Sequence, residues 1–498
     1  MYLLGCDIGS SSVKVALVDA STGKTIGTSH YPDTEMSIAS PQPEWAEQNP
    51  DDWWEALCAA TRRLMAKTQV PPAQIASIGI AYQMHGLVVL DAEGQVLRPA
   101  IIWCDSRAVT IGNQAFASIG QSYCLENYLN APGNFTASKL RWVQENEPEI
   151  FAKIHKIMLP GDYIAYRMTG KIATTICGLS EGILWDFKSN TNASKLMEHY
   201  QIPERLLADV VPVFGTQGRL TAAAAAQLGL VAGVPIGYRA GDQPNNALAL
   251  NVMRPGEVAA TGGTSGVVYA VSERPVFDPQ QRVNGFAHVN YSPDNPLTGV
   301  LLCINGAGSL YRWVRENVAG AGQISYPEME VLAASVAIGS EGLSILPFGN
   351  GAERMLGNLT TGAQMHGLQF NRHASRHIYR AALEGIAFAF VYGMEAMREM
   401  GISIRTVRVG NDNLFQSAIF SNTIATLMDV DIEVFETNGA VGAAKASGLA
   451  AGIFKTPEEA VGQHSTVLTK YAPSAIDLAS YHQAYIRWKT LLAEKATL

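Results

Sequence analysis

The sequence predicts an α/β protein made of two similar halves, and two strand-turn-strand stretches support this prediction. Residues 3–18 place a Gly/Ser turn between two apolar runs that are rich in β-branched residues. Residues 256–269 repeat the order of strand, Gly/Thr/Ser turn and strand. Such a repeat indicates an internal duplication in which each half opens on a hairpin. We therefore expect two domains, residues 1–246 and 247–498.

The two turns have the composition of phosphate-binding loops. Glycine lets the backbone come close to a ligand, and neighbouring amides and hydroxyls suit phosphate oxygens. Asp7 ends the first apolar run, and a carboxylate beside bound phosphates is suited to hold Mg²⁺, directly or through water. On the first stretch alone, a Ser-rich hairpin without a ligand is an equal alternative. The expected phosphate-binding residues are Gly9, Ser10, Ser11, Ser12, Gly263, Thr264 and Ser265.

Local signals predict the elements that follow the first hairpin. Residues 23–25 (Gly-Lys-Thr) form a turn between strands and not a P-loop, because Val18 stands where a P-loop needs glycine. Asn49 is suited to cap a helix over residues 50–67, with proline in its first position. The apolar run 75–81 predicts a buried strand.

Two strand ends hold candidate site residues. His85 and Gly86 follow the buried strand 75–81, and a histidine there can offer hydrogen bonds to a polyol in a cleft. A packed structural histidine is the alternative. The strand at 235–238 leads to Asp242, which we expect at the strand end, between Gly241 and a polar turn, in a position suited to catalysis. An ordinary turn aspartate is the alternative.

Composition narrows the class of protein. The formal net charge of −8 and the pI of about 5.7 argue against nucleic-acid binding, which normally shows a basic stripe. The six cysteines have no C-x-x-C spacing, so we expect reduced core thiols and no zinc site. The N-terminus lacks a signal-peptide pattern and no apolar run is long enough for a bilayer, so we expect a cytoplasmic protein without a membrane partner. A homodimer stays an open option.

Four further segments give the chain a family resemblance. They are residues 103–107 (Trp-Cys-Asp-Ser-Arg), 134–145, 346–354 and 363–385. With the two hairpins, they resemble the FGGY family of carbohydrate kinases over nearly the whole chain. That resemblance implies two actin-like ATPase (ribonuclease H-like) domains with a catalytic cleft between them, and ATP and Mg²⁺ as cofactors. Asn134 stands where the family has a small or aromatic residue. Asp105 and Arg107 are expected to form a structural ion pair.

The resemblance also implies roles for single residues. Asp242 matches the family's catalytic acid and is expected to accept the proton of the attacking hydroxyl. Asp7 is expected to position the metal. The implied sugar-binding residues are Met84, His85, Gly86, Trp103, Asp242 and Gln243. The implied adenosine-binding turn contains Gly410, Asn411 and Asn413, where asparagines suited to the left-handed conformation replace the family's glycines. Glu181 has no implied role.

The substrate prediction depends on residues 83–86 (Gln-Met-His-Gly), which resemble the xylulokinases of this family, whereas glycerol kinases have an Arg-Glu pair there. We expect ATP-dependent phosphorylation of the terminal 5-hydroxyl of a ketopentose, and D-xylulose is the favoured substrate. Gln243 matches glycerol kinases instead, so glycerol, L-xylulose and ribulose stay open as substrates. A nucleotide-dependent sugar sensor without turnover is the alternative from another class.

Overall fold

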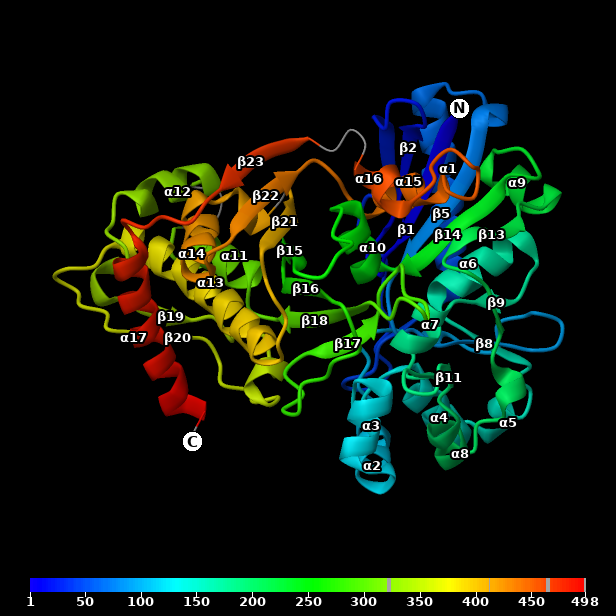
Figure 1. The fold of residues 1–498 in the computed structure, drawn as a ribbon, viewed down its shortest axis with the longest axis horizontal. Helices are drawn as coiled ribbons and strands as arrows, with labels where there is room; N and C mark the ends of the chain where they lie inside the picture. The colour runs from blue at the N-terminus through cyan, green and yellow to red at the C-terminus, as the bar shows by residue number, and fades with distance from the viewer. Residues whose placement is uncertain (320–323, 412, 463–465, 497–498) are drawn as a thin grey trace.

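The computed structural model describes residues 1–319, 324–411, 413–462 and 466–496. The chain forms two α/β bodies side by side, each built around one large sheet (Figure 1). The N-terminus belongs to the body on the right of Figure 1, and the C-terminal helix α17 (Leu478–Ala496) lies on the outer side of the other. The predicted α/β fold with two similar halves is confirmed.

The first sheet has the strand order β13-β14-β5-β1-β2-β3. Its strands are β1 (Tyr2–Ile8), β2 (Val13–Asp19), β3 (Thr25–Tyr31), β5 (Ile75–Tyr82), β13 (Phe214–Arg219) and β14 (Pro235–Gly241). Strands β14, β5 and β1 run parallel, and the other pairings are antiparallel. The parallel strands are almost wholly buried, as expected for strands covered on both faces.

The second sheet repeats this arrangement. Among the described residues its order is β17-β18-β16-β15-β21-β22-β23. Its strands are β15 (Glu257–Gly262), β16 (Gly266–Ser272), β17 (Asn284–Ala287), β18 (Thr298–Ile304), β21 (Thr406–Gly410), β22 (Asp431–Phe435) and β23 (Val467–Tyr471). From β18 to β23 the pairings are antiparallel twice, parallel twice and antiparallel once, as they are from β3 to β13. Both predicted hairpins, β1–β2 and β15–β16, therefore occupy equivalent places.

Helices and short strands surround the two sheets. The helices of the first half are α1 (Pro50–Thr68), α2 (Val109–Ile119), α3 (Gln121–Tyr128), α4 (Thr136–Asn146), α5 (Pro148–Phe151), α6 (Pro160–Thr169), α7 (Ile176–Glu181), α8 (Ser194–Tyr200), α9 (Ala222–Leu228) and α10 (Asp242–Ala249). Those of the second half are α11 (Gly308–Asn317), α12 (Tyr326–Ala334), α13 (Ser375–Glu399), α14 (Ala418–Met428), α15 (Gly439–Ser447), α16 (Pro457–Gly462) and α17. The short strands are β4 (Glu47–Gln48), β6 (Val88–Leu90), β7 (Ala100–Ile101), β8 (Lys156–Met158), β9 (Ala173–Thr174), β10 (Trp185–Asp186), β11 (Thr191–Asn192), β12 (Asp209–Val210), β19 (Ser344–Leu346) and β20 (Gln364–His366). Short 3-10 helices cover Pro72–Gln74, Glu204–Leu206, Ser340–Gly342, Arg354–Leu356 and Asn413–Gln416.

Each half contributes a helix that contacts the sheet of the other half. Helix α15 of the second half packs on β1, β5 and β2 of the first sheet, while α10 contacts α15 and reaches β15 and β16. A Cβ atom at Gly5 would lie 1.8 Å from Ala440 O, and one at Gly79 would lie 1.9 Å from Ala443 O. Backbones this close leave no room for a side chain, so both strands need glycine where α15 crosses them. The boundary expected at residue 246 falls inside α10.

The predicted start of the first long helix is confirmed. Helix α1 begins at Pro50, and the Asn49 side chain accepts a hydrogen bond from the Asp51 amide at 3.3 Å. This contact satisfies one of the N–H groups that a helix start leaves without an internal partner. Residues 20–24 form the predicted turn between β2 and β3.

The expectation of core thiols is wrong for two of the six cysteines. All six are free, but Cys104 and Cys303 are exposed. Cys104 lies in the loop after β7, and Cys303 is the one exposed residue of β18. Neither position could be told from the sequence, because each depends on what covers the strand end.

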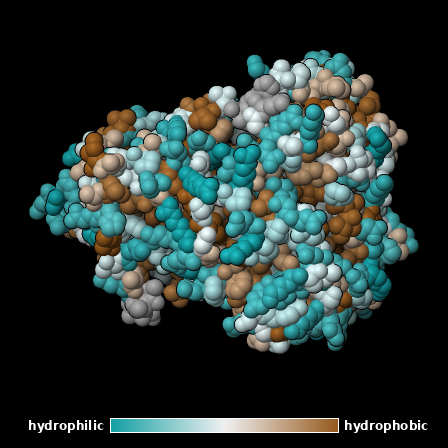
Figure 2. Space-filling view, in the orientation of Figure 1, coloured by the Kyte–Doolittle hydropathy of each residue, from teal (hydrophilic) through white to brown (hydrophobic). Residues whose placement is uncertain are grey.

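The surface in Figure 2 is largely hydrophilic, and its hydrophobic residues lie in separate patches. In the part of the chain that the structure describes, every helix is too short or too polar to cross a membrane.

Candidate active site

Three neighbouring parallel strands bring the predicted residues together. The strands β14, β5 and β1 are adjacent, so their carboxyl ends meet at one edge of the first sheet. Asp7 is the last residue but one of β1, His85 follows β5 by three positions, and Asp242 directly follows β14. The sheet order therefore gathers side chains that are far apart in the sequence at the place where open α/β sheets bind ligands.

Asp242 lies at the strand end as predicted, but it is the first residue of α10, so a helix follows it and not the expected polar turn. Gly241 precedes the helix as its N-cap, and an acid is favoured in the first turn by the positive end of the helix dipole. Pro244 is tolerated there because first-turn amides have no partner within the helix. Burial, and next the negative charge of Asp7, raise the pKa of Asp242 from 3.8 to about 7. Such a carboxyl can exchange a proton near neutral pH.

Asp7 is covered by the start of α15. A Cβ atom at Gly439 would lie 2.6 Å from Asp7 Oδ2, so glycine is needed where the helix meets this carboxylate. Burial raises the pKa of Asp7, and Lys14 opposes that effect. Asp7 and Asp242 both lose hydration and repel one another, and a divalent cation bound near them would offset both effects. Among the described residues, no three acids, histidines or cysteines are grouped as a metal site.

His85 is held by several contacts in an unusual backbone conformation. Its φ is 63°, in the left-handed region that non-glycine residues rarely adopt. Its Nδ1 lies 2.8 Å from Glu181 O, and its ring packs edge-on against Phe135 at 4.8 Å between centroids. Burial lowers the pKa of His85 to about 3, with Lys139 and Arg354 as further causes. The imidazole is therefore neutral at physiological pH.

Met84 and Gly86 flank His85 in tightly packed positions. A Cβ atom at Gly86 would lie 2.6 Å from Pro160 Cγ, so the turn after β5 fits against α6 only with glycine. A Cβ atom at Gly241 would lie 2.6 Å from Met84 Cγ. Met84 therefore packs directly against the backbone that leads into Asp242.

Trp103 and Gln243 lie at the rim of the same region. Trp103 is 53% exposed, and its Nε1 donates to Ser10 Oγ at 3.3 Å. The ring therefore does not fill the core and stands beside the first hairpin turn. Gln243 donates hydrogen bonds to Asp242 from its backbone and its side chain, and both lower the pKa of the acid.

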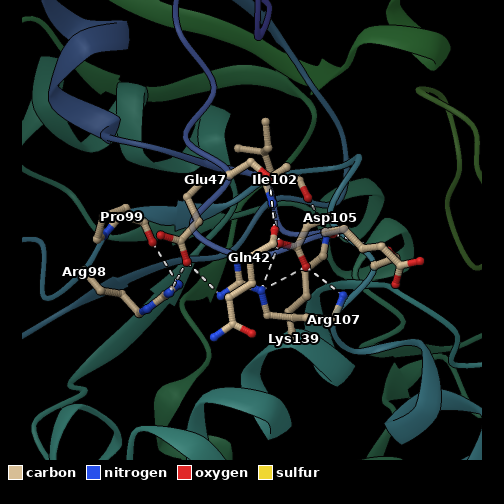
Figure 3. A network of polar contacts seen from close by, with 12 residues as sticks. Gln42, Glu47, Arg98, Pro99, Ile102, Asp105, Arg107 and Lys139 are labelled. Carbon is tan, nitrogen blue, oxygen red and sulfur yellow. Dashed lines mark hydrogen bonds and ion pairs between the residues drawn. The ribbon is translucent and has the colours of Figure 1, made fainter.

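A buried ion network fixes the segment before and after Trp103 (Figure 3). Arg107 pairs with Asp105 and with Glu47, each at 2.7 Å, which confirms the predicted structural pair. Asp105 Oδ2 also accepts the Ala46 amide at 2.6 Å. These contacts join the strand pair β4–β7 to the loop that presents Trp103.

Lys139 connects this loop to His85. Its Nζ donates to the carbonyl oxygens of His85 and Ile102, both at 2.9 Å. Ile102 precedes Trp103, and Figure 3 includes its contact with Lys139. Burial lowers the pKa of Lys139 to about 7. One buried ammonium group therefore fixes two loops that bear predicted sugar-binding residues.

The first hairpin turn is closed by its own backbone. The Gly9 amide donates to Ser12 O at 3.2 Å. The Ser10 carbonyl accepts from Gln48 Nε2 and the Ser11 carbonyl from the Met36 amide, both at 2.7 Å. Because these two carbonyls and the Gly9 amide are bound within the protein, the amides of residues 10–12 are the groups of the turn that are available to an anion.

The second hairpin borders a cavity of about 580 Å³. Gly263 and Thr264 line it, and their carbonyls accept the amides of Gly308 and Ser309 at 3.0 and 3.1 Å. Ser265 is not among the lining residues. The far walls come from α11, α12 and the segment after β21, with Tyr311, Arg312, Tyr326, Glu330, Gln416 and Ser417. The cavity has the size of a small-molecule site.

The predicted adenosine turn lies next to this cavity. Gly410 ends β21, and the Asn411 carbonyl accepts from Gln416 Nε2 at 3.1 Å. Asn411 does not take the left-handed conformation suggested by the sequence, because its amide extends the ladder to Phe435 O at 2.9 Å. The Asn413 side chain lies outside the described residues.

Sequence reasoning missed several residues of this region. Glu181 and Lys139 contact His85 from α7 and α4, and nothing in their local sequence indicates this. Arg312 and Gln416 line the cavity, and no motif of the sequence indicates a role for either residue. Contacts between distant segments leave no local signal in a single sequence.

Comparison with known proteins supports this arrangement. Two family models match: the N-terminal domain of the FGGY family of carbohydrate kinases over residues 2–249, and its C-terminal domain over residues 258–451. The xylulose kinase of Escherichia coli (strain K12) is 30% identical over 465 residues, covering 93% of this chain and 91% of that protein. The xylulose kinase of Bacillus subtilis (strain 168) is 27% identical and covers 98% of this chain and 96% of its own length. The crystal structure of xylulose kinase from Rhodospirillum rubrum superimposes with a TM-score of 0.88 at 25% identity, covering 99% of each chain.

Proposed function

The chain belongs to the FGGY family of carbohydrate kinases, and we propose that it transfers the γ-phosphoryl group of ATP to the terminal 5-hydroxyl of D-xylulose. The observation that supports this most is the meeting of Asp242, His85 and Asp7 at one sheet edge. The relatives named as xylulose kinases match over nearly the whole chain, which favours this ketopentose over glycerol, L-xylulose and ribulose.

Asp242 acts as the general base in this proposal. The ionised carboxylate accepts the proton of the 5-hydroxyl while the oxygen attacks the γ-phosphorus, and ADP leaves with the pair of electrons of the broken P–O bond. The raised pKa of Asp242 suits the task, because a base is most effective when its pKa lies near the working pH.

The nucleotide lies in the cavity beside the second hairpin, with its phosphates directed towards Asp242. Gly263, Thr264 and Ser265 hold phosphate oxygens from the second half, and residues 9–12 do so from the first. The base and ribose lie towards the residues 410, 411 and 413 and the walls from α11 and α12. The cavity volume and the amides of residues 10–12 in the first turn support this placement.

Asp7 would hold Mg²⁺ that arrives with the nucleotide. A single carboxylate fits this ion, because Mg²⁺ commonly binds one or two protein carboxylates, waters and substrate phosphates. When bound, the ion neutralises charge on the transferred group. The raised pKa values of Asp7 and Asp242 fit such a site, since a cation would relieve both.

The sugar lies against Met84, His85, Gly86, Trp103 and Gln243. The neutral imidazole and the Gln243 amide offer hydrogen bonds to hydroxyls, and the half-exposed indole of Trp103 offers an apolar face. Closure of the halves over the sugar would exclude water and limit hydrolysis of ATP.

The experiment measures ADP release with Mg-ATP and D-xylulose, L-xylulose, D-ribulose, L-ribulose or glycerol, with a control lacking sugar. Selective turnover of D-xylulose is expected, and Asp242→Asn should abolish it. Turnover of another substrate would overturn the choice of sugar alone. Release of ADP by Asp242→Asn at the rate of the unchanged enzyme would refute the role of Asp242 as the base.

A further inference from the structure

Glu181 is a buried acid that the proposed reaction does not use. It ends α7, is 1% exposed, and lies with Met84 against the backbone that leads into Asp242. A Cβ atom at Gly241 would lie 2.5 Å from Glu181 Oε2 and 2.6 Å from Met84 Cγ. Burial raises the pKa of Glu181 well above its ordinary value. An acid this costly to bury needs a compensating role.

Glu181 holds both the backbone and the ring of His85. The His85 amide points to Glu181 Oε1 at 3.4 Å, and the imidazole Nδ1 lies 2.8 Å from the Glu181 carbonyl oxygen. Lys139 holds the His85 carbonyl from the other side at 2.9 Å. These contacts stabilise the left-handed backbone of His85, a conformation that is intrinsically unfavourable for a residue other than glycine.

The contact with a carbonyl fixes the tautomer of His85. A carbonyl oxygen can only accept, so Nδ1 must carry the proton. In a neutral imidazole the other nitrogen, Nε2, is then an acceptor. His85 is only partly buried, so its Nε2 can meet a ligand in the cleft.

The second half supports the same arrangement. The Phe286 ring of β17 lies 5.2 Å from the His85 ring between centroids. The Ala287 amide donates to Ser180 Oγ at 2.8 Å, one residue before Glu181. The end of α7 and the imidazole are therefore held from both halves.

We propose that Glu181 is a positioning residue that fixes His85 as a hydrogen-bond acceptor for a hydroxyl of the bound sugar. Its carboxyl oxygen holds the His85 amide, and its carbonyl holds Nδ1–H. The inference rests on the proposed function, because it assumes a sugar at His85. It adds a chemical requirement: the hydroxyl at this position must donate.

Two substitutions of nearly equal size separate this role from simple packing. Glu181→Met removes the acceptor for the His85 amide, and the KM for D-xylulose should rise about tenfold while the KM for ATP stays within about twofold. Glu181→Gln keeps an acceptor oxygen, so its KM for D-xylulose should stay within about threefold of the KM of the unchanged enzyme. Asp186→Ala is the control, because it removes another buried acid of this half that binds the amides of Lys188 and Ser189. It should lower the melting temperature without changing the sugar KM.

An unchanged sugar KM in Glu181→Met, or equal effects of the Met and Gln variants, would overturn the proposal. The tautomer is tested separately by ¹⁵N NMR of the histidine-labelled protein without ligands, with His85→Gln assigning the signal. Protonation of Nδ1 is expected, and protonation of Nε2 would overturn the proposal even if Glu181→Met did not fold. If the unchanged enzyme turned over no ketopentose, the proposed function would fail, whereas the NMR result would still decide the state of His85.

Discussion

Replacing Asp242 by asparagine should stabilise the protein at alkaline pH while it abolishes phosphoryl transfer. The rise of the pKa from 3.8 to about 7 corresponds to about 4 kcal/mol against the ionised form in the folded chain. The folded chain keeps this proton up to about pH 7, whereas the unfolded chain releases it near pH 4. The folded state thus binds more protons between these values, and the free energy of unfolding falls as the pH rises through them.

Asparagine removes this penalty because it carries no charge. Since the Asp242 side chain is not fully enclosed, we expect part of the penalty to be recovered, about 1–3 kcal/mol at pH 8. The assay compares melting temperatures of the two proteins at pH 5 and pH 8, with EDTA and without nucleotide, so that no cation offsets the charge. The variant should melt a few degrees higher at pH 8, and its advantage should shrink at pH 5.

The control is Asp186→Asn, which changes a buried acid whose carboxylate accepts backbone amides. It should melt lower at both pH values, because it loses accepted hydrogen bonds. If Asp242→Asn also melted lower at pH 8, the penalty on the ionised acid would not exist. The reasoning from burial and from the charge of Asp7 would then be wrong.

Three further predictions concern the base Asp242, the packing of α15 on the first sheet and the buried Lys139. With Mg-ATP present, kcat/KM for the sugar should fall on acidification, because Asp242 must be ionised to act as the base. The apparent pKa of this fall should lie well above 3.8 and no higher than about 7, since a bound cation lowers the pKa of Asp242. A kcat/KM that stays constant between about pH 5 and 8 would contradict this prediction. Gly79→Ala should lower the melting temperature by several degrees, because its Cβ would lie 1.9 Å from Ala443 O. Lys139→Met should raise the sugar KM about tenfold, because the His85 carbonyl loses its donor, and kinetics with varied sugar and ATP test this.

The glycine prediction has a matched control in the chain. Among the described residues, the atom nearest to a Cβ at Gly462 in α16 would be Asn251 Nδ2 at 3.5 Å, which is an ordinary contact. Gly462→Ala should therefore leave the melting temperature unchanged or slightly higher. Equal effects of the two substitutions would show that α15 does not limit the space at Gly79.

Local chemistry in the sequence determined much of this protein. The apolar runs around residues 9–12 and 263–265 specify two hairpins, because β-branched runs and Gly/Ser turns act within a few residues. The Asn49 cap, the strand before His85 and the strand before Asp242 are local in the same way. Together with the motifs shared with the FGGY family, they predicted the fold and the candidate base.

The tertiary structure decided how these parts meet. Glu181 and His85 are 96 positions apart, and Lys139 and His85 are 54 apart, so neither contact has a local signal. The packing of α15 on the first sheet depends on how the halves fold together, and the cavity walls from α11 and α12 depend on how distant segments of the second half fold together. The pKa values of Asp242 and His85 follow from that burial, because desolvation depends on everything packed around a group and not on its neighbours in sequence.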